Sequence, residues 1–432
     1  MATAAMVQPP PPRGPPPPTS RPPPPPPPPR GPPPPSGPPP PPRGPPPPRA
    51  RVTKRPHDTN TYAQKKQPRV SIIRPKTLRD VTVFQKKNQV GQGTYGSVFM
   101  GIDKDNSDVV ALKRINTEQE ENGFPITAIR EVKILKALNN PNVVTLREIV
   151  TSKEKDQMPK SVYMVFEYLE YDLTGLLETS EIRLTQDHVK SWSQQLLSGV
   201  HYMHTNKIIH RDLKASNLLV NRKGELKIAD FGLARSWNVE MKRLTNRVIT
   251  LWYRPPELLL GCESYSPKID MWSVGCIIAE MFRRSGFLKG SDEATQLDLI
   301  FKVAGHPTRE EWPDLPQTCR LWKKFDPNMN GGVTHTRRIS EALRSNAPNP
   351  HWITKHAEEI VDKLLILNPK DRWSASDALD AEYFFETPIW KKAEDLNMNF
   401  SVDSVHEWEA RRKQEKIMAQ RREKAQATRR GR

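Results

Sequence analysis

The chain has 432 residues and a net charge of +18, and 29 of its 46 prolines lie within the first 50 residues. The charge is uneven, because residues 1–87 carry 16 basic and 2 acidic side chains, residues 411–432 carry 10 and 2, and the remainder is close to −4. The basic character therefore belongs to the two ends and says little about the central part. The opening MATAAMVQPPPP lacks a hydrophobic h-region, and no apolar run approaches the roughly 18 residues of a membrane span, so we expect a soluble intracellular protein.

The three cysteines, Cys262, Cys276 and Cys319, are too few and too widely spaced for a disulfide framework or a four-ligand zinc site. This usage favours a reducing compartment. We therefore expect no disulfide framework in the fold.

Residues 1–50 repeat the motif RGPPPP and offer no side chains for a core, so we expect a disordered, extended polyproline II tail. Such a tail is either a ligand for SH3- or WW-type domains or a solvated spacer, and the sequence does not choose between them. Residues 51–80 form a basic linker in which TKRP is followed about ten residues later by QKKQPR. This spacing resembles a bipartite nuclear import signal, although short basic clusters also match by chance.

From Val81 the pattern changes to that of a folded domain. The runs SVFMGI, VVALKRI, NVVTLREIV and SVYMVFEY are rich in β-branched and aromatic residues, which indicates strands, and one helix, PITAIREVKILKAL, interrupts them. After Asp172 the apolar residues recur at helical steps, as in HVKSWSQQLLSGVHYMH, and IDMWSVGCIIAEMF is apolar on most faces. The pattern predicts an α+β fold with a small β-rich lobe over residues 81–168 and a large helical lobe over residues 169–386.

Three glycines, Gly91, Gly93 and Gly96, form a G-x-G-x-x-G motif between two predicted strands. Glycines permit a tight turn and let backbone N–H groups approach phosphate oxygens. The same spacing occurs in dinucleotide-binding folds, but there the loop opens a helix, whereas here a strand follows. We therefore interpret the loop as a phosphate-binding hairpin.

Lys113 ends the predicted strand VVALK, seventeen residues after Gly96. Taken alone, a lysine at a strand end is usually just solvated. With a glycine loop upstream and a helix bearing Glu131 downstream, Lys113 can hold the α- and β-phosphates of a nucleotide while Glu131 fixes its ammonium group.

The stretch HRDLKASN and the later DFG supply the other groups that phosphoryl transfer needs. Asp212 is placed as the base near the accepting hydroxyl, and Lys214 as the cation on the moving phosphate. Asn217 and Asp230 provide the oxygens that hold metal ions. The alternative, that the two motifs are unrelated loops, leaves the glycine loop and the lysine before them without explanation.

Together these motifs resemble the eukaryotic protein kinase family over roughly residues 84–386, with PPE where most kinases have APE. The resemblance implies the bilobal kinase fold with ATP and Mg²⁺ as cofactors. It also implies a pair between Glu257 and Arg372, with Asp270 bracing the catalytic loop. The implied ATP-binding residues are Val90, Gly91, Gly93, Gly96, Val98, Ala111, Lys113, Glu167, Leu169 and Leu219.

The stretch PITAIRE is similar to the signature helix of the cyclin-dependent kinases, and GTYGSV, DFGLAR and VITLWYRPPELLLG match the same group. A mitogen-activated kinase would show T-x-Y in the activation segment, where this chain reads KRLTNRVIT. The stretch GFPITAIRE and the small Ala215 resemble the transcription-elongation branch, which includes the P-TEFb kinase and the plant class C kinases. This resemblance implies a T- or K-type cyclin as partner, the RNA polymerase II C-terminal domain as substrate, and the nucleus as location.

Within this family Thr245 is implied as the activating phosphosite. A phosphate adds close to two negative charges, which bidentate arginines neutralise best, and Arg130, Arg211 and Arg235 match the family's phosphothreonine pocket. Because neighbours on a helix point about 100° apart, we expect Glu131 to face the ATP site while Arg130 faces Thr245. A cyclin on the outer face of this helix would move both contacts together.

Val248, Ile249 and Arg254 match positions that in this family shape a pocket for proline. An amide donor there would be left unsatisfied, whereas proline has none to lose, so we expect Ser/Thr-Pro substrates. Thr94 and Tyr95 lie where related cell-cycle kinases are inhibited by phosphorylation, and the sequence leaves their modification open.

Residues 387–432 form the expected C-terminal extension, in which SVHEWEARRKQEKIMAQRREKAQ predicts a basic helix with Glu407 and Arg411 at i,i+4. The helix is either simply solvated or a nucleic-acid contact. In some elongation kinases a His-Glu pair like His406 and Glu407 reaches back over the nucleotide.

Two other interpretations stay open from the sequence. Motifs separate a splicing or cell-cycle cyclin-dependent kinase poorly from an elongation kinase, because the cyclin helps to set location and substrate. An inactive kinase-fold scaffold acting through its tails would usually lack one or more catalytic residues. All five are present, namely Lys113, Glu131, Asp212, Asn217 and Asp230.

Overall fold

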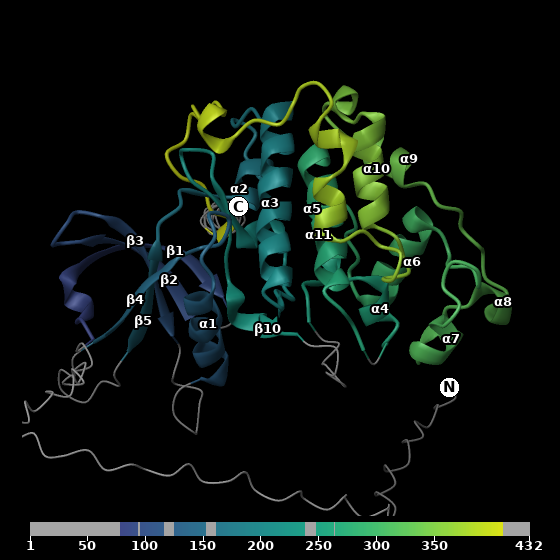
Figure 1. Ribbon diagram of the computed structural model, residues 1–432, viewed down its shortest axis with the longest axis horizontal. Helices are drawn as coiled ribbons and strands as arrows, with labels where there is room; N and C mark the ends of the chain where they lie inside the picture. The colour runs from purple at the N-terminus through teal and green to yellow at the C-terminus, as the bar shows by residue number, and fades with distance from the viewer. Residues whose placement is uncertain are drawn as a thin grey trace, which may run out of the picture. The chain divides into compact units, whose positions relative to one another are not determined.

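The computed structural model describes residues 78–93, 96–115, 125–152, 161–237, 248–262 and 264–408, all within the compact unit Arg74–Arg432. These residues form a small lobe built on a β-sheet and a large lobe built mainly of helices (Figure 1). The predicted α+β architecture is confirmed. None of the helices in the described ranges is long and apolar enough to cross a membrane.

Several predicted features lie outside these ranges and stay predictions. They are the proline-rich tail, the basic linker up to residue 77, Thr94, Tyr95, Thr245 and the basic helix beyond Trp408.

The small lobe is an antiparallel sheet with the strand order β1-β2-β3-β5-β4. Its strands are β1 (Phe84–Gly93), β2 (Gly96–Asp103), β3 (Val109–Ile115), β4 (Leu146–Thr151) and β5 (Val162–Glu167). Alternation along β3 buries Val110 and Leu112 on one face and turns Lys113 to the other. The register places Lys113 between Val98 of β2 and Met164 of β5.

The PITAIRE sequence forms α1 (Ile126–Ala137). Its inner face buries Glu131 and Ile134, whereas Ile126 and Ile129 are 70% and 53% exposed. The helix therefore presents an apolar outer face in addition to its packed inner one.

The large lobe is organised around α3 and α5, whose fully buried side chains include Trp192 and Trp272. Its helices are α2 (Leu173–Glu178), α3 (Gln186–Thr205), α4 (Pro256–Leu259), α5 (Lys268–Arg283), α6 (Glu293–Ala304), α7 (Leu315–Thr318), α8 (Pro327–Asn330), α9 (Ile339–Arg344), α10 (Lys355–Leu364) and α11 (Ala375–Leu379). Helix α5 is buried from Ile269 to Phe282, as its apolar sequence predicts.

Short strands and 3₁₀ turns place the HRD and DFG segments. The strands are β6 (Tyr171–Asp172), β7 (Ile208–Ile209), β8 (Leu218–Val220), β9 (Leu226–Ile228) and β10 (Arg235–Ser236). Two 3₁₀ turns lie in these segments, η2 (Ala215–Asn217) and η3 (Phe231–Leu233). The other 3₁₀ turns lie elsewhere and are η1 (Val81–Val83), η4 (Leu251–Tyr253), η5 (Trp322–Lys324), η6 (Pro350–Trp352), η7 (Glu382–Phe384) and η8 (Ala393–Asp395). The HRD segment therefore lies between β7 and η2, and the DFG segment between β9 and β10.

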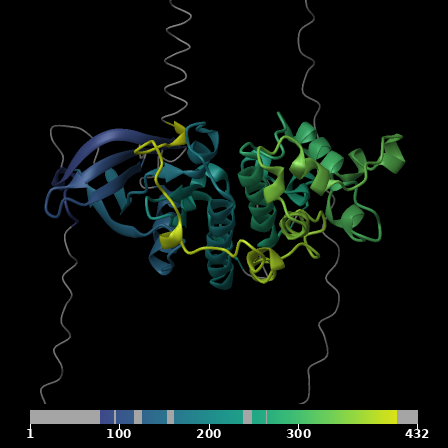
Figure 2. The same ribbon diagram turned by 90° about the horizontal axis from the view of Figure 1, so that it is seen from above.

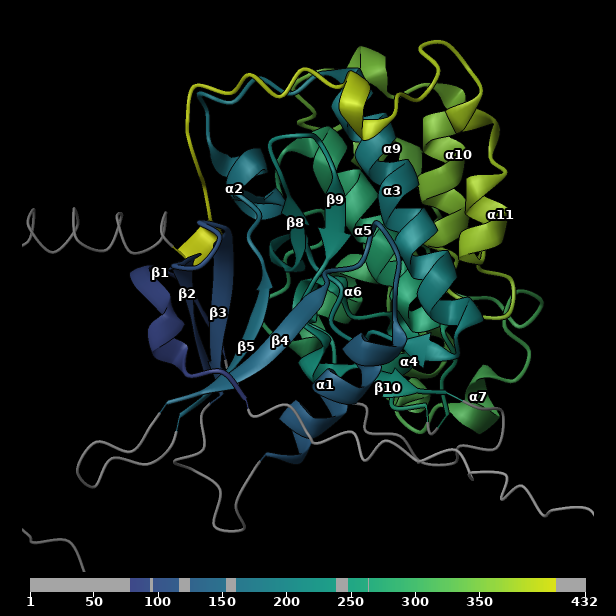
Figure 3. The ribbon, with the colours of Figure 1, turned by 60° about the vertical axis from the view of Figure 1, so that its left-hand side comes forward.

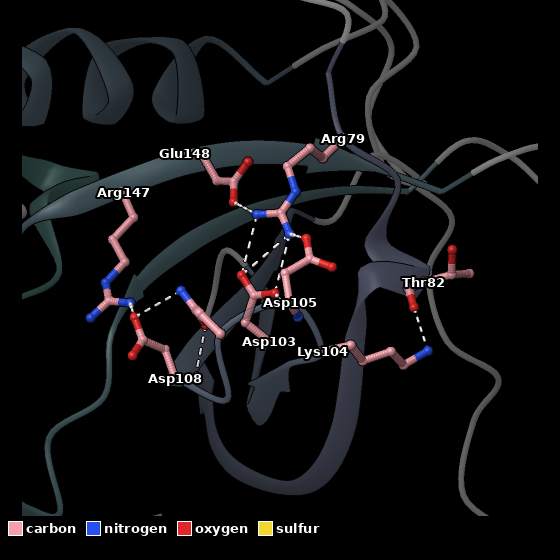
Figure 4. Close-up of polar contacts among 9 residues, drawn as sticks. Arg79, Thr82, Asp103, Lys104, Asp105, Asp108, Arg147 and Glu148 are labelled. Carbon is pink, nitrogen blue, oxygen red and sulfur yellow. Dashed lines mark hydrogen bonds and ion pairs between the residues drawn. The ribbon is translucent and has the colours of Figure 1, made fainter.

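Three ion pairs of Arg79 hold the chain where it enters the small lobe. Figure 4 shows the Arg79 guanidinium between the carboxylates of Asp103, Asp105 and Glu148, at 3.1, 2.8 and 2.7 Å. The carbonyl of Arg79 also accepts the N–H of Thr151 at 3.2 Å. These contacts fix the chain beside the edge strand β4.

Residues 387–408, called the strap below, run back from the end of the large lobe to the connection between the lobes. Figures 2 and 3 show the strap passing one end of α3 and then running on toward the sheet of the small lobe. Lys391 pairs with Asp187 at 2.8 Å, and the Nε2–H of His188 donates to the carbonyl of Asn397 at 3.0 Å. The strap is thus anchored at the N-terminal end of α3.

The expectation for the cysteines is wrong in one respect, because Cys262 and Cys319 form a disulfide. Their Cα atoms lie 4.0 Å apart although 57 positions separate them in the sequence. Spacing along the chain carries no information about this approach, which depends on how the segments after α4 and α7 fold together. Cys276 is buried and free.

Candidate active site

Three charged side chains from three elements meet between the lobes. The Nζ atom of Lys113 lies 2.8 Å from Oε1 of Glu131 on α1 and 2.9 Å from Oδ1 of Asp230 in the DFG segment. The predicted contact between Lys113 and Glu131 is confirmed, and Asp230 shares it. The positions of α1 and of the DFG segment are therefore coupled through one lysine.

Burial and charge act in opposite directions on these groups. Burial would lower the pKa of Lys113, but the carboxylates of Asp230 and Glu131 outweigh it, so the pKa is raised. Burial would raise the pKa of Asp230, but Lys113 lowers it below its ordinary value. Burial raises the pKa of Glu131 more than Lys113 lowers it. Lys113 thus stays cationic and Asp230 anionic, as phosphate and metal binding require.

The HRD aspartate is held by neighbours on both sides. Asp212 Oδ1 accepts the N–H and the hydroxyl of Thr250 at 3.1 and 2.9 Å, and Oδ2 lies 3.0 Å from Nζ of Lys214. Asn217 donates Nδ2 to the Asp212 carbonyl at 2.8 Å. Because its amide nitrogen is committed in this way, Asn217 keeps Oδ1 for another ligand.

Asp270 fixes the backbone of the HRD segment from the start of α5. Its carboxylate accepts the N–H groups of His210 and Arg211 at 2.9 and 3.0 Å, and Nε2 of His204 at 2.9 Å. Burial would raise its pKa, but these donors, led by His204, lower it. Arg211 has a φ of 66°, an uncommon conformation outside glycine that the two backbone bonds hold in place. The predicted brace is confirmed.

The PPE glutamate forms the predicted pair with the large lobe. Arg372 donates Nη1 and Nη2 to the two carboxylate oxygens of Glu257 at 2.8 and 2.9 Å. Both side chains are almost completely buried. A bidentate buried pair of this kind anchors α4, and with it the end of the activation segment.

The predicted ATP-binding residues come from both lobes, and their contacts with a nucleotide stay a prediction. In the glycine loop, Gly93 pairs with Gly96 across the hairpin, and Gly96 has a φ of 145°, which side chains rarely adopt. The structure places these residues on β1 (Val90, Gly91, Gly93), β2 (Gly96, Val98), β3 (Ala111, Lys113), β5 (Glu167), β8 (Leu219) and the connection after β5 (Leu169).

Arg211 of the predicted phosphothreonine pocket is 4% exposed. It donates Nε to a backbone carbonyl at 2.8 Å and Nη1 to the hydroxyl of Tyr265 at 3.1 Å. Both acceptors are neutral, and no carboxylate of the described ranges forms an ion pair with it. Arg130 and Arg235 are half-buried. A buried guanidinium with neutral partners suits an anionic ligand, so the predicted pocket keeps its physical basis.

The predicted proline pocket contains a strained backbone. Ile249 has a φ of 68°, which is costly for a β-branched residue. Its carbonyl accepts Nε and Nη2 of Arg254 at 3.2 and 3.0 Å. Because this carbonyl is committed to Arg254, it is not free for a substrate N–H, and proline has none to offer.

Sequence reasoning missed a support beneath this loop. The hydroxyl of Tyr253 donates to Oε2 of Glu280 on α5 at 2.7 Å, and the hydroxyl of Ser273 donates to the Tyr253 carbonyl at 2.9 Å. Nothing in the local sequence pairs these residues, because they lie 20 or more positions apart.

Sequence reasoning also missed most of the contacts of the strap. The pair His406 and Glu407 was the one feature of the sequence that indicated them. Val405 donates its N–H to Glu170 O and accepts the N–H of Asp172, both at 3.1 Å. The N–H of Glu407 donates to Oδ2 of Asp172 at 2.6 Å, and His406 is 7% exposed. A Cβ at Gly175 would lie 2.6 Å from Val405, so only glycine lets the strap pass this close to α2.

Fold and site define the class of this protein. The protein kinase domain family matches residues 84–384, and the chain belongs to that family.

Within the family, the chain is 45% identical over 348 residues to cyclin-dependent kinase C-1 of Arabidopsis thaliana, covering 78% of this chain and 66% of the relative. It is 43% identical to cyclin-dependent kinase 9 of Danio rerio, covering 71% and 82%. A chain of the yeast RNA Pol II CTD kinase CTDK-1 complex matches with a TM-score of 0.64 and 38% identity, covering 73% of this chain and 97% of that one. The protein belongs to the cyclin-dependent kinases, as the motifs predicted. It spans slightly less than two thirds of the plant relatives' length.

Proposed function

We propose that this protein is a cyclin-dependent serine/threonine kinase of transcription elongation. It transfers the γ-phosphate of ATP to Ser/Thr-Pro sites of the RNA polymerase II C-terminal domain. The observation that carries the proposal is the contact of Lys113 with both Glu131 and Asp230. Similarity to the yeast RNA Pol II CTD kinase supports the choice of substrate, and similarity to the plant and fish cyclin-dependent kinases supports the need for a cyclin. An inactive scaffold would have no need of this arrangement.

The contacts support the following catalytic roles. Asp212 takes the proton of the accepting hydroxyl as its oxygen bonds to the γ-phosphorus; the bond from that phosphorus to the β–γ bridging oxygen breaks, ADP leaves, and Lys214 balances charge on the transferred group. Lys113 binds the α- and β-phosphates. Carboxylate and amide oxygens suit Mg²⁺, which takes its remaining ligands from phosphate and water, so Asp230 and Asn217 Oδ1 fit as its protein ligands. When bound, Mg²⁺ neutralises the phosphate oxygens.

The cyclin binds the outer face of α1. Ile126 and Ile129 give this face its exposed apolar surface, and Glu131 lies on the opposite face of the same helix. A T- or K-type cyclin pressing on the isoleucines therefore controls the contact between Glu131 and Lys113.

Phosphorylation of Thr245 completes activation by giving Arg130, Arg211 and Arg235 a common anion. The nucleus is the expected site of action, since its substrate is there. Contacts of the proline-rich tail with SH3- or WW-type domains, and of the basic C-terminal end with nucleic acid, stay predictions.

The test uses the full chain with a T- or K-type cyclin and a peptide of polymerase repeats. We expect cyclin-dependent phosphate transfer to serine followed by proline, and no transfer when that proline is replaced by alanine. The matched Asp212→Asn variant keeps the shape of the site but lacks the base. Equal labelling by wild type and Asp212→Asn would overturn the proposal, and dependence on a mitotic cyclin alone would assign the chain to the cell cycle instead.

A further inference from the structure

The disulfide joins two buried cysteines just beneath the surface. Cys262 and Cys319 are 4% and 1% exposed, and they face each other in an antiparallel β-bridge. The neighbours of Cys319 on both sides, Thr318 and Arg320, are exposed, so a small local opening brings the sulfurs to solvent. The remaining cysteine, Cys276, is different, because burial in α5 raises the pKa of its thiol and makes it a poor nucleophile.

The bond ties the segment just after α4 to the segment just after α7. The N–H of Cys262 donates to the carbonyl of Glu257 at 2.9 Å, one residue of the buried pair that anchors α4. In the other direction, the N–H of Leu321 donates to the carbonyl of Leu260 at 3.0 Å. Two backbone hydrogen bonds and one covalent bond therefore fix the same short turn.

A tyrosine close to Cys262 in the sequence contacts Arg211 of the predicted phosphothreonine pocket. Three residues further on, Tyr265 is 9% exposed and accepts a hydrogen bond from Nη1 of Arg211 at 3.1 Å. Arg211 in turn has its backbone bound to Asp270. Tyr265, three positions after Cys262, is thus bonded to the arginine that is expected to bind phosphorylated Thr245.

We infer that Cys262 and Cys319 form a reversible redox modification site, which sets how firmly Tyr265 holds Arg211. The inference rests on the proposed function, because only an activating phosphate gives Arg211 an anion to bind. In reducing compartments a protein disulfide is usually transient and redox-sensing, which fits a bond near the predicted phosphothreonine pocket.

The oxidant is a low-molecular-weight disulfide such as glutathione disulfide. The thiolate of one cysteine attacks it and displaces one glutathione thiolate, and the second cysteine then attacks the mixed disulfide and displaces the other. One protein disulfide forms, one glutathione disulfide is reduced to two glutathione thiols, and the two thiol protons pass to the released glutathione.

Closing the bond stabilises the loop and the pocket together. Because it links positions 57 residues apart, the cross-link restricts the unfolded chain and should raise the melting temperature by about 5 °C. A hydrogen bond to a charged group that is loosened but not lost changes activity by roughly threefold. We therefore expect the oxidised, Thr245-phosphorylated kinase to be about three times more active than the reduced one, with little redox effect before phosphorylation.

In the experiment, the full chain with its T- or K-type cyclin is equilibrated in a series of buffers that differ in the ratio of reduced to oxidised glutathione. Three quantities are measured: the Cys262–Cys319 cross-linked peptide by mass spectrometry without reduction, the melting temperature, and transfer to a Ser-Pro repeat peptide. In wild type and in the control Cys276→Ser, we expect all three to change over the same range of ratios. In Cys262→Ser we expect all three to stay flat.

Sulfurs that remain thiols, or remain bonded, at every ratio would overturn reversibility. In a Tyr265→Phe variant, closing the bond should no longer change activity about threefold, and a full threefold response in this variant would overturn the link to Arg211. A complex that transfers no phosphate at any ratio would refute the proposed function instead, while the cross-link and melting temperature would still decide whether the pair is reversible.

Discussion

The buried carboxyl of Glu280 gives the protein a pH-dependent stability whose sign and size follow from its surroundings. Glu280 is 6% exposed, and burial raises its pKa from 4.5 to about 7, against the opposing hydrogen bond from Tyr253 and the charge of Lys289. The carboxylates of Glu178 and Glu407 raise it further. Between the unfolded and folded pKa values, the folded state holds a proton that the unfolded state lacks. This contribution is fully present below pH 4.5 and is lost as the pH rises through about 7.

The change Glu280→Gln isolates this effect, because glutamine keeps an acceptor oxygen for Tyr253 but cannot ionise. From pH 5.5 to pH 8 the free energy of unfolding of the wild type falls by about 2 kcal/mol, because the folded carboxyl keeps its proton over roughly 1.5 pH units of this range. That of the variant does not fall. For a domain of this size, about 2 kcal/mol corresponds to about 3 °C in melting temperature. The melting temperature of the variant minus that of the wild type should therefore increase by about 3 °C across this pH range, whatever the difference is at pH 5.5.

Thermal unfolding of both proteins at four pH values from 5.5 to 8.5 measures the difference directly. The control is Glu394→Gln, which makes the same substitution at a carboxyl that is three-quarters exposed. A pH-independent gap between Glu280→Gln and wild type would refute the reasoning, because it would mean that Glu280 is ionised throughout.

Three further outcomes test other parts of the structure. Lys113→Met removes the cation shared by Glu131 and Asp230 and should lower kcat by at least about 100-fold, as measured by peptide phosphorylation. Glu257→Gln leaves the buried Arg372 without its anion and should cost about 3–5 kcal/mol of unfolding free energy, seen as a lower melting temperature. Arg79→Ala should cost only about 1 kcal/mol despite its three ion pairs, because that arginine is about one-third exposed, and a larger loss in urea unfolding would contradict this estimate.

The sequence was sufficient for the catalytic groups because their motifs are local. In HRDLKASN, Asp212 and Asn217 lie within six residues, and the turn that holds them together is set by that short stretch. The contact between Lys113 and Glu131 was predictable for a different reason. The glycine loop before Lys113 and the helix bearing Glu131 after it occur in the order that a phosphate-binding lysine and its carboxylate partner require.

Features that depend on contacts between distant segments could not be read in this way. Periodicity reports which face of an element is apolar, but not which other element covers it. The strap pairs Val405 with Glu170, more than 230 positions earlier, and no local pattern marks either residue. No local pattern predicts the disulfide between Cys262 and Cys319 either.

The helix α5 illustrates why burial alone does not decide the charge of a carboxylate. Asp270 and Glu280 lie ten residues apart, about 15 Å along one buried helix, so both lose the solvation of water. Asp270 receives two backbone N–H donors and a histidine, and its pKa is lowered. Glu280 receives the hydroxyl of Tyr253, and its pKa is raised. The number and kind of hydrogen-bond donors therefore decide whether a buried carboxylate stays charged. The HRD segment is held by a carboxylate that stays charged, whereas Tyr253 is held by a carboxyl that titrates near neutrality.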